Sequence, residues 1–237
     1  MTAPNRTGFV VTDIERADAA TIDALGAHGV ATVHEAMGRT GLVGASVTPI
    51  QDGTRVSGSA VTVLNWPGNN LMLHAAVEQC SEGDIVVATT VSPALDGSFG
   101  ELFATALKRR GVRGLVTTGG VRDVSDLREM GFPVWSAAVN AQGTVKAVAG
   151  SVNVPITVGE TVVRAGDVII ADDDGVVCVP REECAAVLTA SDARVATEAA
   201  SRADYQAGGL SLDRNNLRPV LADLGVRYVT EREFTEG

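Results

Sequence analysis

The stretch Gly114-Leu-Val-Thr-Thr-Gly-Gly-Val-Arg-Asp123 is the most informative part of this 237-residue chain about its fold. Its short apolar run, bounded by glycines on both sides, predicts a buried strand that runs into a glycine turn. The apolar spacing of residues 124–130 then predicts a helix. Arg122 and Asp123 are therefore expected at a strand-to-helix junction, which is where open α/β sheets bind ligands. Adjacent opposite charges at this place indicate a small anionic substrate.

The Arg122-Asp123 pair also has a purely structural interpretation. Asp123 would accept hydrogen bonds from the free N–H groups of the following helix, and Arg122 would point into solvent. The two glycines before the pair favour the functional interpretation, because glycine lets a ligand approach the backbone closely. The pair alone does not decide between the two.

Residues 98–110 read as a glycine-containing loop followed by an amphipathic helix. The free amides from Gly100 through Leu102 to Phe103, at the positive end of that helix, would suit a carboxylate, with Arg122 holding an oxyanion beside it. Asp123 and Glu101 could then hold a divalent metal, directly or through water. The alternative is a capping box, in which Glu101 reaches back to the amide three residues before it, and the spacing alone slightly favours this cap.

The composition predicts one soluble domain that binds a small ligand. Hydrophobic residues make up 45% of the chain, enough for one sizeable core. A net charge of -10 argues against nucleic acid as a partner, since phosphate binding depends on clustered Lys and Arg. The three cysteines have no C-x-x-C spacing, which argues against a disulfide framework. No apolar run approaches the roughly 20 residues of a membrane span, so we expect a cytoplasmic protein that does not enter membranes.

Along the chain, strand and helix patterns alternate, which predicts an α/β fold. The expected strands lie at 55–64, 84–90, 114–118 and 134–138, with a β-rich cluster at 145–179, and the expected helices at 12–29, 32–38, 69–79 and 182–206. The late strands are too close together for helical crossovers, so antiparallel or mixed pairing is expected there. An Asp-Gly step at 174–175 predicts a hairpin turn rather than a metal site. His74 is interpreted as a half-buried, hydrogen-bonded histidine on an apolar helix face and not as a metal ligand.

An acidic residue followed after twenty residues by Arg-Asp is a further pattern in this chain, formed by Glu101, Arg122 and Asp123. It resembles the signature of the class II pyruvate aldolases that cleave 4-hydroxy-4-methyl-2-oxoglutarate and 4-carboxy-4-hydroxy-2-oxoadipate. Other segments similar to this family cover most of the chain: Thr32-Val-His-Glu-Ala-Met-Gly38, Pro67-Gly-Asn-Asn-Leu-Met-Leu-His74, Met130-Gly-Phe-Pro-Val-Trp135, Gly143-Thr-Val-Lys146, Gly150-Ser-Val-Asn-Val-Pro155 and Gly166-Asp-Val-Ile-Ile-Ala-Asp-Asp-Asp-Gly-Val-Val177.

The resemblance implies a layered β/β/α fold of the swivelling-domain type, with mixed sheets and peripheral helices. It implies a single domain over 1–237, in which 182–237 forms a helical extension that packs on a neighbouring subunit. The assembly would be a homotrimer or a dimer of trimers. A further acid would come from the neighbouring subunit, and Glu198 is the nearest match to it, although a solvated helix face explains that residue equally.

The resemblance also implies a mechanism that uses Mg²⁺ or Mn²⁺. Asp123 would bind the metal directly, with Glu101 and Glu198 as possible ligands through water. Arg122 would stabilise the oxyanion of the pyruvate enolate, the amides of Gly100, Leu102 and Phe103 would bind the substrate carboxylate, and Glu101 would orient a metal-bound water as the base.

The reaction would cleave a 4-hydroxy-2-oxo dicarboxylic or tricarboxylic acid to pyruvate and a second oxo acid. Loss of carbon dioxide from oxaloacetate gives the same enolate, so decarboxylase activity is expected as well. The same fold family includes regulator of ribonuclease activity A, a binding protein without aldolase chemistry that lacks the Arg-Asp pair. A non-catalytic regulator of a ribonuclease, or an enzyme with a divergent oxo-acid substrate, is the alternative.

Overall fold

The computed structural model describes residues 8–236, which form two units, one ending at Asp192 and the other beginning at Ala193. The helices are α1 (Ala19–His28), α2 (Val30–Ala36), α3 (Leu71–Gln79), α4 (Glu101–Arg109), α5 (Val124–Glu129), α6 (Cys184–Gln206), α7 (Ser211–Arg214), α8 (Arg218–Asp223) and α9 (Glu231–Glu236). The strands are β1 (Thr48–Pro49), β2 (Val56–Asn65), β3 (Asp84–Thr90), β4 (Gly97–Phe99), β5 (Gly114–Val121), β6 (Val134–Val139), β7 (Ser151–Val152), β8 (Ile156–Val158), β9 (Thr161–Val163), β10 (Val168–Asp172) and β11 (Gly175–Val179).

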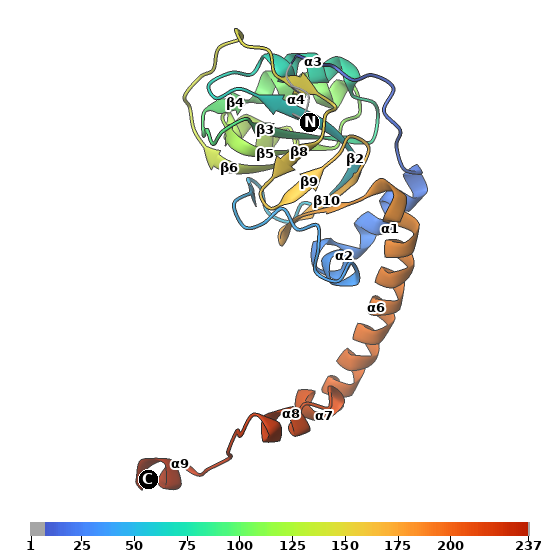
Figure 1. The fold of residues 1–237 in the computed structure, drawn as a ribbon, viewed down its shortest axis with the longest axis vertical. Coiled ribbons are helices and arrows are strands. Elements are labelled where there is room, and N and C mark those ends of the chain that lie inside the picture. The colour runs from blue at the N-terminus through green and yellow to red at the C-terminus, as the bar shows by residue number, and fades with distance from the viewer. Residues whose placement is uncertain (1–7, 237) are drawn as a thin grey trace, which may run out of the picture. The chain divides into compact units, whose positions relative to one another are not determined.

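One mixed sheet organises the first unit, with the strand order β1-β6-β5-β3-β2-β10-β11 (Figure 1). Its centre is parallel, since β2, β3, β5 and β6 pair in parallel and helices connect them. Its flanks are antiparallel, because β10 pairs with β2 and β11, and β1 pairs with β6. A central block of parallel strands brings four carboxyl ends to one edge of the sheet, and this edge positions the candidate site.

Three clusters of buried hydrophobic residues lie between the layers of the first unit and hold them together. The first lies between the central strands and the helices α3, α4 and α5, with Phe99, Leu115 and Phe132 fully buried in it. The second lies between the sheet and the β8-β9 hairpin, around Trp135 and Ile169. The third joins β10 and β11 to α1, α2 and the start of α6. A helix layer on one sheet face and a second β layer on the other form a β/β/α arrangement.

Several predicted elements are confirmed with small shifts in their bounds. β3 occupies the predicted residues, and β2, β6, α3 and α6 differ from the predictions by one or two residues. The Asp-Gly hairpin is also confirmed, because β10 and β11 pair across a turn with Asp172 opposite Gly175. The β8-β9 and β10-β11 pairs are antiparallel, as the short connections between them predicted.

The expected first helix is too long at its start, because α1 begins only at Ala19. Asp18 caps it by accepting a hydrogen bond from the amide of Thr21 at 3.0 Å. The residues before it are held in another conformation by contacts distant in sequence: Arg16 binds the carboxylate of Asp84 through two hydrogen bonds of 2.8 Å. Tertiary contacts therefore override the local helical pattern.

The expected glycine turn before Arg122 is also wrong, because β5 continues through Gly119 and Gly120 to Val121. The register with β6 shifts between Thr117 and Gly120, so the two glycines form an irregular part of the strand. A Cβ atom at Gly120 would collide with the carbonyl oxygen of Leu95, which explains the need for glycine there. The strand therefore places Arg122 and Asp123 directly at its end.

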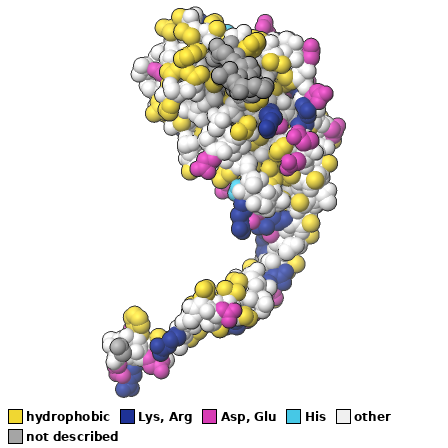
Figure 2. All heavy atoms as spheres, in the orientation of Figure 1, with side chains coloured by type: hydrophobic (Ala, Val, Ile, Leu, Met, Phe, Trp, Pro, Cys, Tyr) yellow, Lys and Arg dark blue, Asp and Glu magenta, His cyan; other side chains and the backbone are white. Residues whose placement is uncertain are grey.

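The second unit consists of the later part of α6 and the short helices α7, α8 and α9. None of its described residues is buried. It exposes several large apolar side chains (Figure 2), namely Val195, Tyr205, Leu210, Leu217, Val220, Leu224, Val226, Tyr228, Val229 and Phe234. The predicted packing of 182–237 on a neighbouring subunit stays a prediction. In residues 8–236, no helix combines the length and the apolar character that crossing a bilayer requires.

Candidate active site

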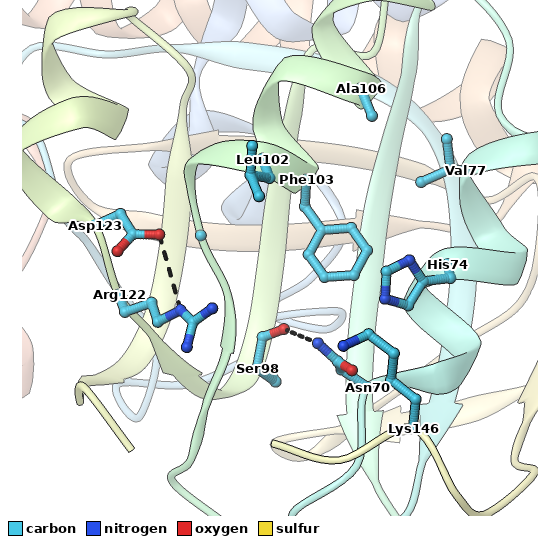
Figure 3. A pocket seen from close by; sticks show the side chains of 11 residues that line it. Asn70, His74, Val77, Ser98, Leu102, Phe103, Ala106, Arg122, Asp123 and Lys146 are labelled. Atoms are coloured by element: carbon cyan, nitrogen blue, oxygen red, sulfur yellow. Dashed lines mark hydrogen bonds and ion pairs between the residues drawn. The ribbon is translucent and has the colours of Figure 1, made fainter. Parts of the chain in front are cut away.

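A cavity of about 300 Å³ lies at the carboxyl edge of the four parallel strands (Figure 3). The segment that follows each of these strands contributes to the wall of the cavity. The segments after β2, β3 and β5 lead to α3, α4 and α5, and the segment after β6 completes the wall. The lining residues are Asn70, His74, Val77, Ser98, Gly100, Leu102, Phe103, Ala106, Arg122, Asp123 and Lys146. The cavity is therefore where an open α/β sheet is expected to bind a ligand.

Arg122 and Asp123 both line this cavity, as the sequence predicted for a functional pair. They form a loose ion pair, with 3.8 Å between Arg122 Nε and Asp123 Oδ2, and each side chain remains about half exposed (Figure 3). The amide of Arg122 donates a hydrogen bond of 2.9 Å to the carbonyl of Phe99, which ties the end of β5 to β4. A rigid backbone thus presents two charged groups whose hydrogen-bonding capacity is largely unused.

Asp123 caps a different helix from the one expected. Its side chain makes no hydrogen bond to α5, the helix that follows it in sequence. Instead, its Oδ2 accepts a hydrogen bond of 3.2 Å from the amide of Glu101, the first residue of α4. Its backbone has a left-handed conformation with φ of 55°, which is uncommon outside glycine. This local strain aims the carboxylate across the cavity towards α4.

Gly100 permits this contact. A Cβ atom at this position would collide with the carboxylate of Asp123. The predicted capping box is not formed, because α4 has Gly100 as its N-cap and Glu101 accepts a hydrogen bond of 2.7 Å from the hydroxyl of Thr105. Of the amides predicted to bind a carboxylate, that of Glu101 is therefore occupied by Asp123. Within the described residues, the predicted amides of Gly100, Leu102 and Phe103 donate no hydrogen bond, so they remain available to a ligand.

The two further acids of the predicted site are not in the cavity wall. Glu101 precedes two lining residues, but its carboxylate is engaged by Thr105. Glu198 belongs to the second unit, where its carboxylate forms an ion pair of 2.9 Å with Arg194 one helical turn away. The predicted role of Glu198 in the site of a neighbouring subunit stays a prediction.

Four polar side chains in the wall were not predicted as site residues: Asn70, His74, Ser98 and Lys146. Asn70 is buried, and its side-chain amide donates a hydrogen bond of 3.1 Å to the carbonyl of Ser98. His74 is exposed rather than half-buried, and its ring lies 4.5 Å from that of Phe103. The ring is nevertheless partly shielded from water, and this loss of hydration, followed by the charge of Lys146, lowers the pKa of His74 below its ordinary value. The segments 67–74 and 143–146 match the family motifs, and this match was the sequence signal that could have identified Asn70, His74 and Lys146 as site residues.

Asp123 is the one acidic residue among the described residues in the wall of the cavity, so it is the side chain there that could bind a hard divalent cation. Among residues 8–236, no three His, Cys, Asp or Glu side chains are grouped so that they could hold a metal ion. Asp123 nevertheless offers a carboxylate that is 40% exposed at the cavity wall, where no cysteine of the described chain competes for a metal ion. Mg²⁺ is commonly bound by one or two carboxylates, with water and substrate as the other ligands.

The three cysteines do not contribute to the site. All are buried and unpaired, as the sequence predicted. Burial raises the pKa of the Cys80 thiol to about 12 and that of Cys184 to about 11, so both stay protonated at neutral pH. A protonated, buried thiol is a poor nucleophile and a poor metal ligand.

Residues 30–178 match a family model named RraA-like and described as Aldolase/RraA. A protein of Burkholderia multivorans named "Putative 4-hydroxy-4-methyl-2-oxoglutarate aldolase" is 36% identical over 134 residues, which cover 55% of this chain and 79% of that relative. A protein of the same name from Halalkalibacterium halodurans is 29% identical over 136 residues, or 57% of this chain. The chain spans 65% of this second relative, slightly less than two thirds.

Among solved structures, the fold is similar to that of Streptomyces coelicolor RraAS2, an unusual member of the RNase ES inhibitor RraA protein family. The TM-score is 0.73 at 26% identity, over 80% of this chain and 99% of that chain. The resemblance inferred from the sequence and the predicted layered α/β fold are thereby confirmed. Since the family model spans more than half of its residues, this chain belongs to the RraA-like family, also described as Aldolase/RraA.

Proposed function

We propose that this chain catalyses a divalent-metal-dependent retro-aldol cleavage. The substrate would be a 4-hydroxy-2-oxo acid with two or three carboxylates, and the products would be pyruvate and a second oxo acid. The observation that supports this most directly is the convergence of Arg122, Asp123 and the free amides of Leu102 and Phe103 on one cavity. The names of the two aldolase relatives support the same class of reaction.

Each of these groups would act where charge accumulates. The amides of Leu102 and Phe103, at the positive end of α4, bind the carboxylate of the pyruvoyl end. The guanidinium of Arg122 stabilises the negative charge that develops on the keto oxygen as the C3–C4 bond breaks. Asp123 and water would hold Mg²⁺ or Mn²⁺, and a metal bound there would supply Lewis-acid polarisation of the keto oxygen.

Glu101 and Glu198 have more distant roles in this proposal. Glu101 would orient a water molecule that takes the proton of the C4 hydroxyl group and returns a proton to C3 of the enolate, which gives pyruvate. Glu198 of a second copy of the chain would help to hold the metal through water, in a homotrimer or a dimer of trimers. The exposed apolar side chains of the second unit support such an assembly, because a row of unburied apolar groups commonly marks a protein interface.

The proposal is tested by measuring pyruvate release from 4-hydroxy-4-methyl-2-oxoglutarate and from oxaloacetate, with added Mg²⁺ or Mn²⁺ and with chelator. Oxaloacetate is included because its decarboxylation yields the same enolate. We expect release that requires the metal and that falls about 10³-fold in Arg122→Ala, since the enolate charge loses its stabilising cation. The reaction is assigned wrongly if the chelated protein is as active as the metal-loaded one.

The matched control is Arg109→Ala, which removes an exposed arginine of α4 outside the cavity. It changes the net charge by the same amount and should leave pyruvate release unchanged. Circular dichroism and thermal unfolding of both variants separate a lost catalytic group from a lost fold. Equal loss of activity in the two variants would point to a general electrostatic effect and not to Arg122.

A second candidate function is inhibition of a ribonuclease, which the similarity to RraAS2 favours. The acidic character of the chain, with a net charge of -10, suits a basic protein partner. The test is an RNA cleavage assay with a ribonuclease E-type enzyme, with and without this protein. Inhibition that persists in Arg122→Ala and with chelator would favour this function, because a binding protein needs neither the cavity arginine nor the metal.

A further inference from the structure

Two cationic side chains of the described residues line the cavity, Arg122 and Lys146. Lys146 is one of only two lysines in a chain whose net charge is -10. Arg122 has Asp123 as a partner at 3.8 Å, whereas Lys146 forms no ion pair within residues 8–236. An unbalanced positive charge at the wall of a cavity attracts a negative group of a ligand.

The backbone next to Lys146 is firmly placed. The amide of Val145 donates a hydrogen bond of 2.9 Å to the carbonyl of Gly68, and the amide of Asn70 donates one of 3.0 Å to the carbonyl of Val145. These bonds join the loop after β6 to the loop after β2, so that Lys146 leaves the backbone at the cavity wall. The fold therefore fixes the point from which this exposed side chain extends.

Arg122 and Lys146 lie on different sides of the cavity (Figure 3). The side chains of Ser98 and Asn70 lie between the two cations, and the apolar side chain of Phe103 lies to one side of them (Figure 3). Partial burial and the charge of Lys146 lower the pKa of His74, which disfavours a second positive charge beside Lys146. The cavity thus has one positive group on each side.

We propose that Lys146 binds the anionic group of the substrate that lies farthest from the pyruvoyl carboxylate, so that the site selects 2-oxo acids with two anionic ends over those with one. This inference rests on the proposed function, because it assigns the pyruvoyl end to Arg122 and α4. Lys146 is then a specificity-determining residue: it contributes binding energy only when the second carboxylate is present.

The test compares two substrates that differ at this end. The enzyme with Mg²⁺ is assayed for pyruvate release from 4-hydroxy-4-methyl-2-oxoglutarate, which has two carboxylates, and from 4-hydroxy-2-oxopentanoate, which has one. In Lys146→Met we expect kcat/KM for the dicarboxylate to fall about 10- to 100-fold, with the monocarboxylate unchanged within about threefold, because one charge-assisted hydrogen bond is lost. Lys146→Arg should restore most of the preference, and Arg109→Met is the charge-matched control.

A binding measurement separates failure of this inference from failure of the proposed function. Calorimetric titration with 2-oxoglutarate and with 2-oxobutyrate, in the presence of Mg²⁺, needs no turnover. If the wild type releases no pyruvate but prefers 2-oxoglutarate, and Lys146→Met abolishes that preference, the reaction is wrong and the role of Lys146 stands. A preference for the second carboxylate that is the same in the wild type and in Lys146→Met, in either assay, overturns the inference.

Discussion

Two arginine–aspartate pairs lie at opposite edges of the central sheet and differ in how fully they are satisfied. Asp84, at the start of β3, is 1% exposed and accepts two hydrogen bonds from Arg16, both of 2.8 Å, and a third from the amide of Ser81. Asp123, after the end of β5, is 40% exposed and 3.8 Å from Arg122. The charges of Arg16 and Asp84, the buried pair, are neutralised within the protein. The charges of Arg122 and Asp123, the open pair, can still interact with a ligand.

The difference shows that an Arg-Asp pair is not by itself a functional signal. The buried pair fixes the segment before α1 to the sheet, and losing one partner would leave an unpaired buried charge. The open pair is held by a left-handed residue and a contact to α4 that only glycine at position 100 allows. Backbone strain and unused hydrogen-bonding capacity therefore distinguish the candidate active site from a structural ion pair.

The largest expected effect is on activity, at the open pair. Asp123→Asn keeps the side chain's size and removes its charge, so we expect pyruvate release to fall about 10³-fold or more, equivalent to roughly 4 kcal/mol of barrier. The midpoint of thermal unfolding should change little, because the amide oxygen can still accept from Glu101. Steady-state kinetics over a range of Mg²⁺ concentrations checks this, and wild-type activity in the variant would show that Asp123 is only a helix cap.

The next effect is on stability, at the buried pair. Asp84→Asn should lower the free energy of unfolding by about 2–4 kcal/mol, since Arg16 loses its carboxylate in a largely buried place. Urea denaturation measures this. The folded fraction should keep its wild-type kcat, because Asp84 lies at the opposite edge of the sheet from the cavity. A variant that is stable but inactive would reverse the roles assigned to the two pairs.

A smaller effect is expected where the open pair meets α4. Gly100→Ala introduces a methyl group against the carboxylate of Asp123 and should cost about 1–3 kcal/mol of stability. The same substitution in an Asp123→Ala background should cost less, because the colliding group is gone. This double-mutant cycle measures the coupling between the two residues, and additive costs would mean that their contact does not constrain the site.

The smallest expected effect is a pKa shift at the far side of the cavity. Lys146→Met should raise the pKa of His74, because removing a neighbouring positive charge makes protonation of the ring easier. Burial remains, so the pKa should stay below its ordinary value. Titration of the His74 ring protons by NMR in both proteins measures the shift. An unchanged pKa would place Lys146 too far from His74 to act as the cation of that side.

Local patterns predicted most elements and missed those that distant contacts control. Apolar alternation placed β2, β3 and β6 and the helix α3 nearly correctly, since half-buried strands and helices have distinct periods. The residues before Ala19 also have a helical pattern, but the ion pair of Arg16 with Asp84 holds them otherwise. α2 likewise begins ahead of its predicted start, because the side chain of Asp172 accepts a hydrogen bond of 2.9 Å from the amide of Val30.

Some residues of the candidate site could likewise be predicted from the local sequence, and others could not. Arg122 and Asp123 could be predicted because they are adjacent in sequence and follow a recognisable strand. Lys146 and His74 could not be assigned a role, because they come from two other loops that meet only when the strands align in parallel. Nor could spacing predict that Asp123 would cap α4 rather than α5.

The sequence by itself determined the α/β class, the family resemblance, the strand that ends in Arg122-Asp123 and the absence of the pattern expected for a nucleic-acid-binding protein. These properties depend on composition, on hydrophobic period and on neighbouring residues. The tertiary structure alone decided which charges are paired, which amides of α4 stay free, and that Lys146 lines the same cavity as Arg122. Such properties arise from contacts between residues far apart in the chain, which no local pattern encodes.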